Sequence, residues 1–177
     1  MPPRSEVRLT PHLTLRPSEV ADAETAFAIQ SNWNVSRMLR MARFPPDRQE
    51  ITGWFADHPR QWATGEAYRF AVDCDGSMIG LADLDQIDDS AADLGYWFDQ
   101  SAWGRGTASA VGEYLVRFAF AVLDLTRLRS AHADDNPASG RVLVKLGFQP
   151  IDTIPVASRS RGTEILHRRY VFDRLYC

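Results

Sequence analysis

One amphipathic segment, residues 107–123, constrains the fold of this chain more than any other feature. Its apolar side chains recur every three to four positions over more than four turns, at Ala108, Val111, Leu115, Phe118 and Val122. This period predicts a long helix with one buried face. Strand-like segments flank the helix at 94–98 and 128–133, so the sequence predicts a right-handed crossover between two parallel strands.

Upstream of that helix the sequence predicts three antiparallel strands. Strand-like segments and turn-forming residues alternate there, over 68–72, 73–76, 77–84, 88–90 and 93–98. Consecutive strands joined by short turns form a meander. A first strand over 7–16, which Pro17 would end, and a last strand over 162–172 complete the expected sheet.

Shorter helical signals surround these strands. Ser18 is expected to cap a first helix, and Asp47 is expected to cap a second helix that Pro59 ends. Asn136 is expected to cap a third helix, which Gly147 closes. The stretch between the first two helices gives no clear pattern.

Length and composition exclude several classes of protein. The 177 residues fit a single domain over 1–177, a mixed α/β (α+β) fold with helices flanking one largely antiparallel sheet. Because 20 basic residues nearly balance 23 acidic ones, neither nucleic acid nor a membrane surface is an expected partner. Cys74 and Cys177 cannot build a disulfide framework, and no Cys or His spacing predicts a metal site. Without a secretory signal or a long apolar run, we expect a cytoplasmic protein.

The residues that open the long helix carry the clearest functional signal. Gly104-Arg105-Gly106-Thr107-Ala108 lies between a strand end and the first helical turn. Glycines let a ligand approach the main chain, and unpaired first-turn N–H groups favour a phosphate or pyrophosphate. The alternative is a glycine-rich turn that only eases entry to the helix. The loop matches neither a P-loop nor a Gly-x-Gly-x-x-Gly pattern, whose last position here is Ser109.

Four short motifs together resemble the GNAT N-acetyltransferases. They are Leu94-Gly-Tyr-Trp-Phe, Trp103-Gly-Arg-Gly-Thr-Ala, Asp135-Asn-Pro-Ala-Ser and Leu146-Gly-Phe, in this order on a matching series of elements. The resemblance covers about residues 8–173. It is closest to the branch that includes the ribosomal-protein N-terminal acetyltransferases. It implies a GNAT-like sheet and an N-acyltransferase that moves an acetyl group from acetyl-coenzyme A to a primary amine.

The resemblance also implies which residues bind coenzyme A. The family's loop, Arg/Gln-x-x-Gly-x-Gly/Ala, binds the pyrophosphate through main-chain amides, and it matches Trp103, Gly104, Arg105, Gly106, Thr107 and Ala108. Trp103 departs from the usual Arg or Gln, which matters little for contacts made by the backbone. The preceding strand is implied to line the pantetheine arm by main chain, at Tyr96, Trp97 and Phe98. Asn136, in the family's Asn-x-x-Ser motif, is implied to lie beside the thiol.

Two residues are candidates for proton transfer. Ser139 completes Asn-x-x-Ser and is the candidate donor to the departing thiolate, although a first-turn structural role would also explain it. Asp93 occupies a position where the related branch often carries Glu, and it is the candidate base, acting through a water molecule. The alternative for Asp93 is a simple turn-edge aspartate.

The acceptor is the least constrained part of this interpretation. Eight aspartates and no Lys or Arg lie between Asp73 and Asp99, which favours a cationic acceptor unless they form only a solvated hairpin face. A protein N-terminus is the leading candidate acceptor, and a polyamine or an aminoglycoside is the alternative. An alternative of a different class is a non-catalytic protein of the same fold that binds acyl-CoA as a sensor. The sequence does not decide whether the chain forms a homodimer.

Overall fold

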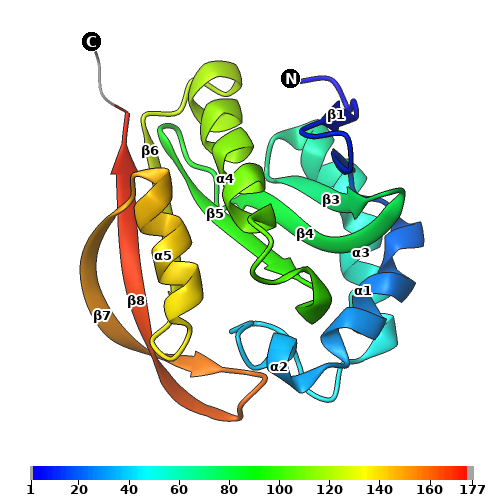
Figure 1. Cartoon of the computed structure of the whole chain (residues 1–177), viewed down its shortest axis with the longest axis vertical. Coiled ribbons are helices and arrows are strands. Elements are labelled where there is room, and N and C mark those ends of the chain that lie inside the picture. The colour runs from blue at the N-terminus through cyan, green and yellow to red at the C-terminus, as the bar shows by residue number, and fades with distance from the viewer. Residues whose placement is uncertain (1, 175–177) are drawn as a thin grey trace.

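The computed structural model describes residues 2–174. Its eight strands form one sheet in the order β1-β2-β3-β4-β5-β6-β8-β7, and helices pack against this sheet (Figure 1). The strands are β1 Val7–Arg8, β2 Leu13–Pro17, β3 Tyr68–Cys74, β4 Ser77–Asp85, β5 Ala91–Phe98, β6 Arg127–Ala133, β7 Gln149–Ser158 and β8 Thr163–Asp173. The helices are α1 Ala23–Gln30, α2 Trp33–Ser36, α3 Arg48–Thr64, α4 Thr107–Arg117, continued by a π-helical turn over Phe118–Val122, and α5 Pro137–Leu146.

The sheet is antiparallel except for the pair β5 and β6, which α4 connects as a crossover. The expected fold class is therefore confirmed, with its meander of β3, β4 and β5 and its single parallel pair. The pairing between β5 and β6 is short, because only Ala91–Asp93 align with Arg127–Arg129. Beyond Asp93 the two strands separate, and we call this gap the split.

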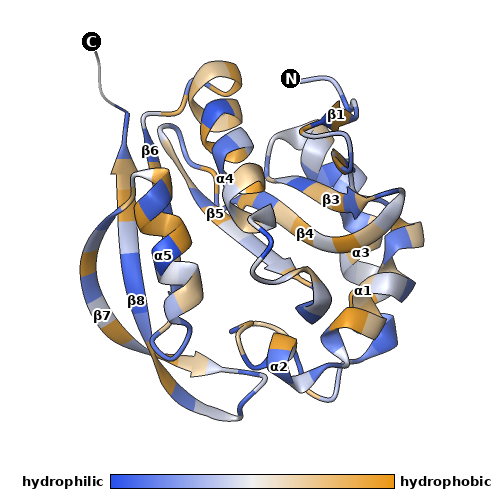
Figure 2. Ribbon diagram, in the orientation of Figure 1, coloured by the Kyte–Doolittle hydropathy of each residue, from blue (hydrophilic) through white to orange (hydrophobic). Residues whose placement is uncertain are grey.

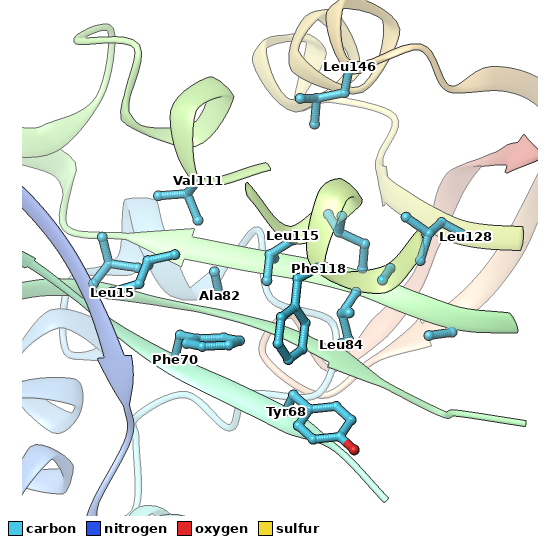
Figure 3. Packing of buried hydrophobic residues seen from close by; sticks show 14 of the residues in the cluster. Leu15, Tyr68, Phe70, Ala82, Leu84, Val111, Leu115, Phe118, Leu128 and Leu146 are labelled. Atoms are coloured by element: carbon cyan, nitrogen blue, oxygen red, sulfur yellow. The ribbon is translucent and has the colours of Figure 1, made fainter. Parts of the chain in front are cut away.

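Helices cover both faces of the sheet. The larger core cluster packs α4 and α5 against one face, where Phe70, Leu84, Leu115, Phe118 and Leu128 converge (Figure 3). The smaller cluster packs α1 and α3 against Leu81 on the other face. Along α4 and α5, apolar and polar residues alternate as expected of helices with one buried face (Figure 2). Each fully buried Leu or Phe contributes about 1.5–3 kcal/mol, so these clusters fix the helices that bear the site.

The N-terminal expectations need correction. The expected strand over 7–16 is two short strands, and Pro17 is the last residue of β2. Ser18 does not cap a helix, because its buried hydroxyl donates to the Arg69 carbonyl at 3.1 Å. The turn begins instead at Glu19, whose N–H donates to the Asp22 carboxylate at 2.8 Å. The local tendency of Ser18 to cap a helix is outweighed here by its hydrogen bond to a distant strand.

Helix α3 does not end at Pro59 but continues to a left-handed cap at Gly65, φ 76°. An internal proline costs a helix about 3 kcal/mol. Burial of Phe55, His58 and Trp62 along the same helix offsets that cost. The Asp47 cap is confirmed, since its side chain accepts the Glu50 N–H.

Strand β7 was not expected, because Pro150 and Pro155 interrupt its sequence. It occupies the edge of the sheet, where one side of the strand needs no hydrogen-bond donors and proline is tolerated. Helix α5 has the expected Asn136 cap and Gly147 end. No helix within residues 2–174 is long and apolar enough to cross a membrane. Cys177 lies outside the described residues, and Cys74 is a free cysteine.

Candidate active site

The glycine-rich loop before α4 has the geometry of an anion site. Gly104 and Gly106 adopt left-handed backbone angles, φ 73° and 80°, and no atom lies within 4 Å of a Cβ built on either. Gly106 is the N-cap of α4, and no side chain caps the helix. The N–H groups of the first turn therefore have no side-chain cap at the positive end of the helix dipole. This arrangement suits a phosphate or pyrophosphate.

Trp103 holds this loop in place, which explains a tryptophan at a position where contacts to the ligand come from the backbone. Its indole Nε1 donates to the Phe98 carbonyl at 3.1 Å. Asp99 accepts the Ser101 N–H at 2.8 Å and so starts the turn that follows β5. Arg105 is exposed at the crest of the loop, where it can contact a bound anion.

The split between β5 and β6 leaves main-chain groups of β5 without a strand partner on that side. Asp99 donates its N–H to the Ile79 carbonyl at 2.7 Å, so odd-numbered residues of β5 direct their main chain toward β4. Because the direction alternates along a strand, Tyr96 and Phe98 direct theirs toward the split. The Phe98 carbonyl is taken by Trp103. Tyr96 thus offers both an N–H and a C=O to an extended ligand, whereas the expected main-chain role of Trp97 is not supported.

The N-terminus of α5 closes the far side of the split. The Asn136 side chain accepts the Ser139 N–H at 3.3 Å, as a helix cap. The Ser139 hydroxyl lies 3.0 Å from the Tyr96 hydroxyl. Burial raises the pKa of Tyr96, so its phenol stays protonated at neutral pH. This contact joins β5 to α5, and no local pattern predicts it because the two residues lie far apart in the chain.

Asp93 lies on β5 itself, and its side chain points to the opposite face of the sheet. Its Oδ1 accepts Arg129 Nε at 2.6 Å, and Arg129 Nη1 also reaches Asp88 at 3.1 Å. Since side chains alternate along a strand, Asp93 projects away from the face that bears the Tyr96 ring. The candidate base and the candidate proton donor therefore flank β5 from its two sides.

Further carboxylates share the Asp93 face of the sheet. Asp85 lies directly across from Asp93 in the register of β4 and β5. Burial, outweighing the neighbouring Arg69, raises the pKa of Asp83 to about 6, and burial also raises that of Asp85. Arg69 forms ion pairs with both. Gly95 makes room for this group, because a Cβ there would lie 2.7 Å from Asp83 Oδ1.

The expected acidic surface is largely neutralised by arginines from elsewhere in the chain. Asp73 pairs with Arg16, and Asp88 and Asp93 pair with Arg129. The C-terminal arginines are likewise ion-paired, among them Arg159 with Glu50 and Arg169 with Asp152. The aspartates therefore do not form a purely acidic surface, and the C-terminal arginines do not form a purely basic one.

The four histidines lie on different parts of the fold, with His167 half-buried on β8. His132 is buried, with Nε2 3.2 Å from the Tyr170 hydroxyl, and His58 is buried in α3. His12 is exposed beside Asp75. Within the described part of the chain no group of His, Cys, Asp and Glu could hold a metal ion.

Comparison with known proteins finds the acetyltransferase (GNAT) domain over residues 12–149. The chain is 29% identical over 149 residues to YdaF of Bacillus subtilis (strain 168), provisionally named a ribosomal N-acetyltransferase, covering 80% of each. It superposes with TM-score 0.83 on RimL, a ribosomal α-N-protein acetyltransferase in complex with coenzyme A, at 19% identity over 96% of this chain and 98% of RimL. Spermidine N-acetyltransferase from Vibrio cholerae gives TM-score 0.79 at 19% identity, covering 93% and 96%.

Proposed function

The chain belongs to the GNAT acetyltransferase family and is an acetyl-CoA-dependent N-acetyltransferase, and on this premise we propose that its acceptor is the α-amine of a protein N-terminus. The split, bounded by the glycine loop at one end and by Ser139 at the other, supports transfer from acetyl-coenzyme A. The observation that carries the choice of acceptor is the pairing of the carboxylates on the Asp93 face with Arg69 and Arg129. The name of the relative YdaF and the activity of RimL support a protein acceptor.

The chemistry of the acceptor also favours an α-amine. The reaction needs a neutral amine, because an ammonium has no lone pair. An α-amine has a pKa of about 7.7–8.0 and a lysine about 10.4, so only the former is substantially neutral near pH 7.5. A site whose candidate base is an ion-paired aspartate suits the less demanding amine.

Acetyl-coenzyme A fits the residues that surround the split, and it supplies the acyl thioester. The uncapped amides of Gly106, Thr107 and Ala108 are suited to its pyrophosphate. The free main-chain groups of Tyr96 match an amide-bearing arm that lies along β5. Asn136 caps the first turn of α5, and we propose that Ser139 in this turn lies beside the thiol end.

In the proposed mechanism one N–C bond forms and one C–S bond breaks. Asp93 accepts, through a water molecule, the proton that the attacking amine loses. The Ser139 hydroxyl donates a proton to the departing sulfur and regains one from solvent. In this mechanism the protonated Tyr96 hydroxyl, 3.0 Å from Ser139 Oγ, is assigned as the donor to the serine, which leaves the serine proton for the sulfur.

A small polyamine is the second candidate acceptor. The fold shared with the Vibrio spermidine enzyme and the carboxylates Asp83, Asp85 and Asp93 on one face favour it. Pairing of these carboxylates with Arg69 and Arg129 weakens their attraction for a polycation. We therefore place the peptide N-terminus first.

A mass-spectrometric acceptor screen tests this assignment. The purified chain and acetyl-coenzyme A are incubated with a library of free N-terminal peptides, the same peptides with blocked N-termini but internal lysines, and spermidine. We expect acetylation of the free peptides at the α-amine and none of the blocked peptides. Turnover of spermidine alone, or modification of lysine side chains in the blocked peptides, would contradict the proposal.

A further inference from the structure

The turn between β7 and β8 is bound to an irregular segment that follows α2. Four hydrogen bonds join them. Arg161 Nε donates to the Arg37 carbonyl at 2.8 Å, and Ser160 Oγ donates to the Leu39 carbonyl at 3.1 Å. The Arg159 N–H donates to the Arg40 carbonyl at 2.8 Å, and its Nη1 donates to the Met41 carbonyl at 3.1 Å. We call residues 37–41 and 158–161 together the clasp.

The clasp satisfies main-chain carbonyls that regular structure leaves unpaired. The hydrogen bonds from the turn therefore tie this half-exposed segment to β7 and β8. Ser158 and Ser160 are both buried and their hydroxyls lie 3.1 Å apart, which stiffens the turn itself. The clasp is therefore a fixed part of the fold.

Asp135 connects the clasp to α5. Its carboxylate accepts Arg161 in a two-point arrangement, Nη2 to Oδ1 at 2.8 Å and Nη1 to Oδ2 at 3.0 Å. Arg37 Nη2 binds the same Oδ2. The Arg161 hydrogen bond, together with both arginine charges, lowers the pKa of Asp135, so the link is ionic at neutral pH. Two arginines from distant parts of the chain thus share one carboxylate.

Asp135 immediately precedes Asn136, the cap of α5, and lies four positions before Ser139. On its other side the same helical turn contacts β5 through the Tyr96 and Ser139 hydroxyls. The N-terminal turn of α5 is therefore held between β5 and the clasp. Figure 1 shows the start of α5, the β7–β8 turn and α2 at the same end of the molecule.

We propose that Asp135 is a positioning residue, which fixes the N-terminal turn of α5 against the clasp and thereby holds the Ser139 hydroxyl at the split. A displacement of about 1 Å in a reacting group can cost about 10²-fold in rate. A half-exposed ion pair contributes little to global stability. Substitution of Asp135 is therefore expected to lower kcat, with little change in the free energy of unfolding. The inference rests on the proton-donor role proposed for Ser139.

Asp135→Asn tests the proposal, because the amide keeps the size of the side chain and removes its charge. We expect kcat to fall about 10-fold, while the KM for acetyl-coenzyme A changes less than about 2-fold, since the pyrophosphate loop lies on another helix. Asp152→Asn is the matched control: Asp152 also binds an arginine, Arg169, at two points and is similarly exposed, but it lies on β7. The control is expected to keep its kcat.

A double mutant separates positioning from a general structural effect. If Asp135 acts through Ser139, Asp135→Asn adds no further loss to Ser139→Ala. The positioning role is wrong if the kcat losses of the two substitutions multiply in the double mutant. It is also wrong if Asp135→Asn alone leaves kcat unchanged. Should Asp135→Asn not fold, Arg161→Gln breaks the same link from the clasp and is held to the same criteria.

The two proposals fail differently. An impaired Ser139→Ala enzyme with a fully active Asp135→Asn enzyme refutes only the positioning role. A fully active Ser139→Ala enzyme refutes the serine donor, and the positioning role with it. Thiol release, measured with any accepted amine, reports both, so neither outcome depends on the identity of the natural acceptor.

Discussion

The Tyr96 hydroxyl lies 3.0 Å from the Ser139 hydroxyl, and this contact spans the point where β5 and β6 separate. Tyr96 lies on β5 and Ser139 lies on α5, and the two residues are far apart in the sequence, so only the folded chain brings them together. Burial raises the pKa of Tyr96, so both hydroxyls carry a proton at neutral pH and either oxygen can donate in this contact. In the proposed mechanism Tyr96 is the donor, which leaves the serine proton for the split.

Substitution of the two hydroxyls should separate their roles. Ser139→Ala removes the proton donor and is expected to lower kcat about 10²-fold with a smaller change in KM for acetyl-coenzyme A. Tyr96→Phe leaves the serine hydroxyl in place but removes its orienting partner, so we expect a smaller loss, about 10-fold. Steady-state kinetics of thiol release measures both. Tyr114→Phe, on α4, serves as control, and an unchanged kcat in Ser139→Ala would remove the donor role.

The glycine loop should lose its ligand when its open side is filled. Gly106→Trp places an indole over the first-turn amides of α4, so we expect no measurable heat with coenzyme A in titration calorimetry. The matched control is Gly76→Trp, which has the same φ of 80° and an equally open Cβ site on the β3–β4 turn. Both variants carry the same backbone strain, about 1 kcal/mol. Equal affinity of the two variants for coenzyme A would count against the loop assignment.

The Asp93 carboxylate should matter for rate and little for cofactor binding. Asp93→Asn removes the proton acceptor, and we expect kcat/KM for the amine to fall about 10²-fold or more. Asp88→Asn is the control, because Asp88 binds the same Arg129 but lies in the turn before β5. Rates are measured from pH 6 to 9 with saturating acetyl-coenzyme A. If Asp93→Asn keeps the wild-type rate at every pH, the base is another group.

Local signals made much of this molecule predictable from sequence. The long helix, its two parallel strands and the Asn136 and Gly147 ends of α5 each follow from residues within a few positions of one another. The four-motif resemblance to the GNAT family is confirmed by the domain match over residues 12–149. Gly104 and Gly106 both adopt left-handed backbone angles, which glycine takes without steric cost.

Features that depend on distant residues could not be predicted in this way. Strand β7 and the continuation of α3 past Pro59 exist because an edge position and core burial tolerate prolines that local rules exclude. The partners of the aspartates come from elsewhere in the chain, as Arg16 does for Asp73. The Tyr96–Ser139 contact and the clasp join segments that only the tertiary fold brings together.

The buried imidazole of His58 should make stability fall in acid. Burial, reinforced by the nearby Arg69, lowers the pKa of His58 to about 3, while the unfolded chain protonates this residue near about 6.5. The stability it contributes is therefore complete above about pH 6.5 and is lost as pH falls toward 3, by at most about 1.4 kcal/mol per pH unit. His58→Gln cannot take up this proton, so its free energy of unfolding should decline less steeply between pH 6.5 and 4. Urea unfolding at four pH values measures the slopes, with the exposed His12→Gln as control. Parallel curves for wild type and His58→Gln would show that the native state protonates His58 as readily as the unfolded chain does.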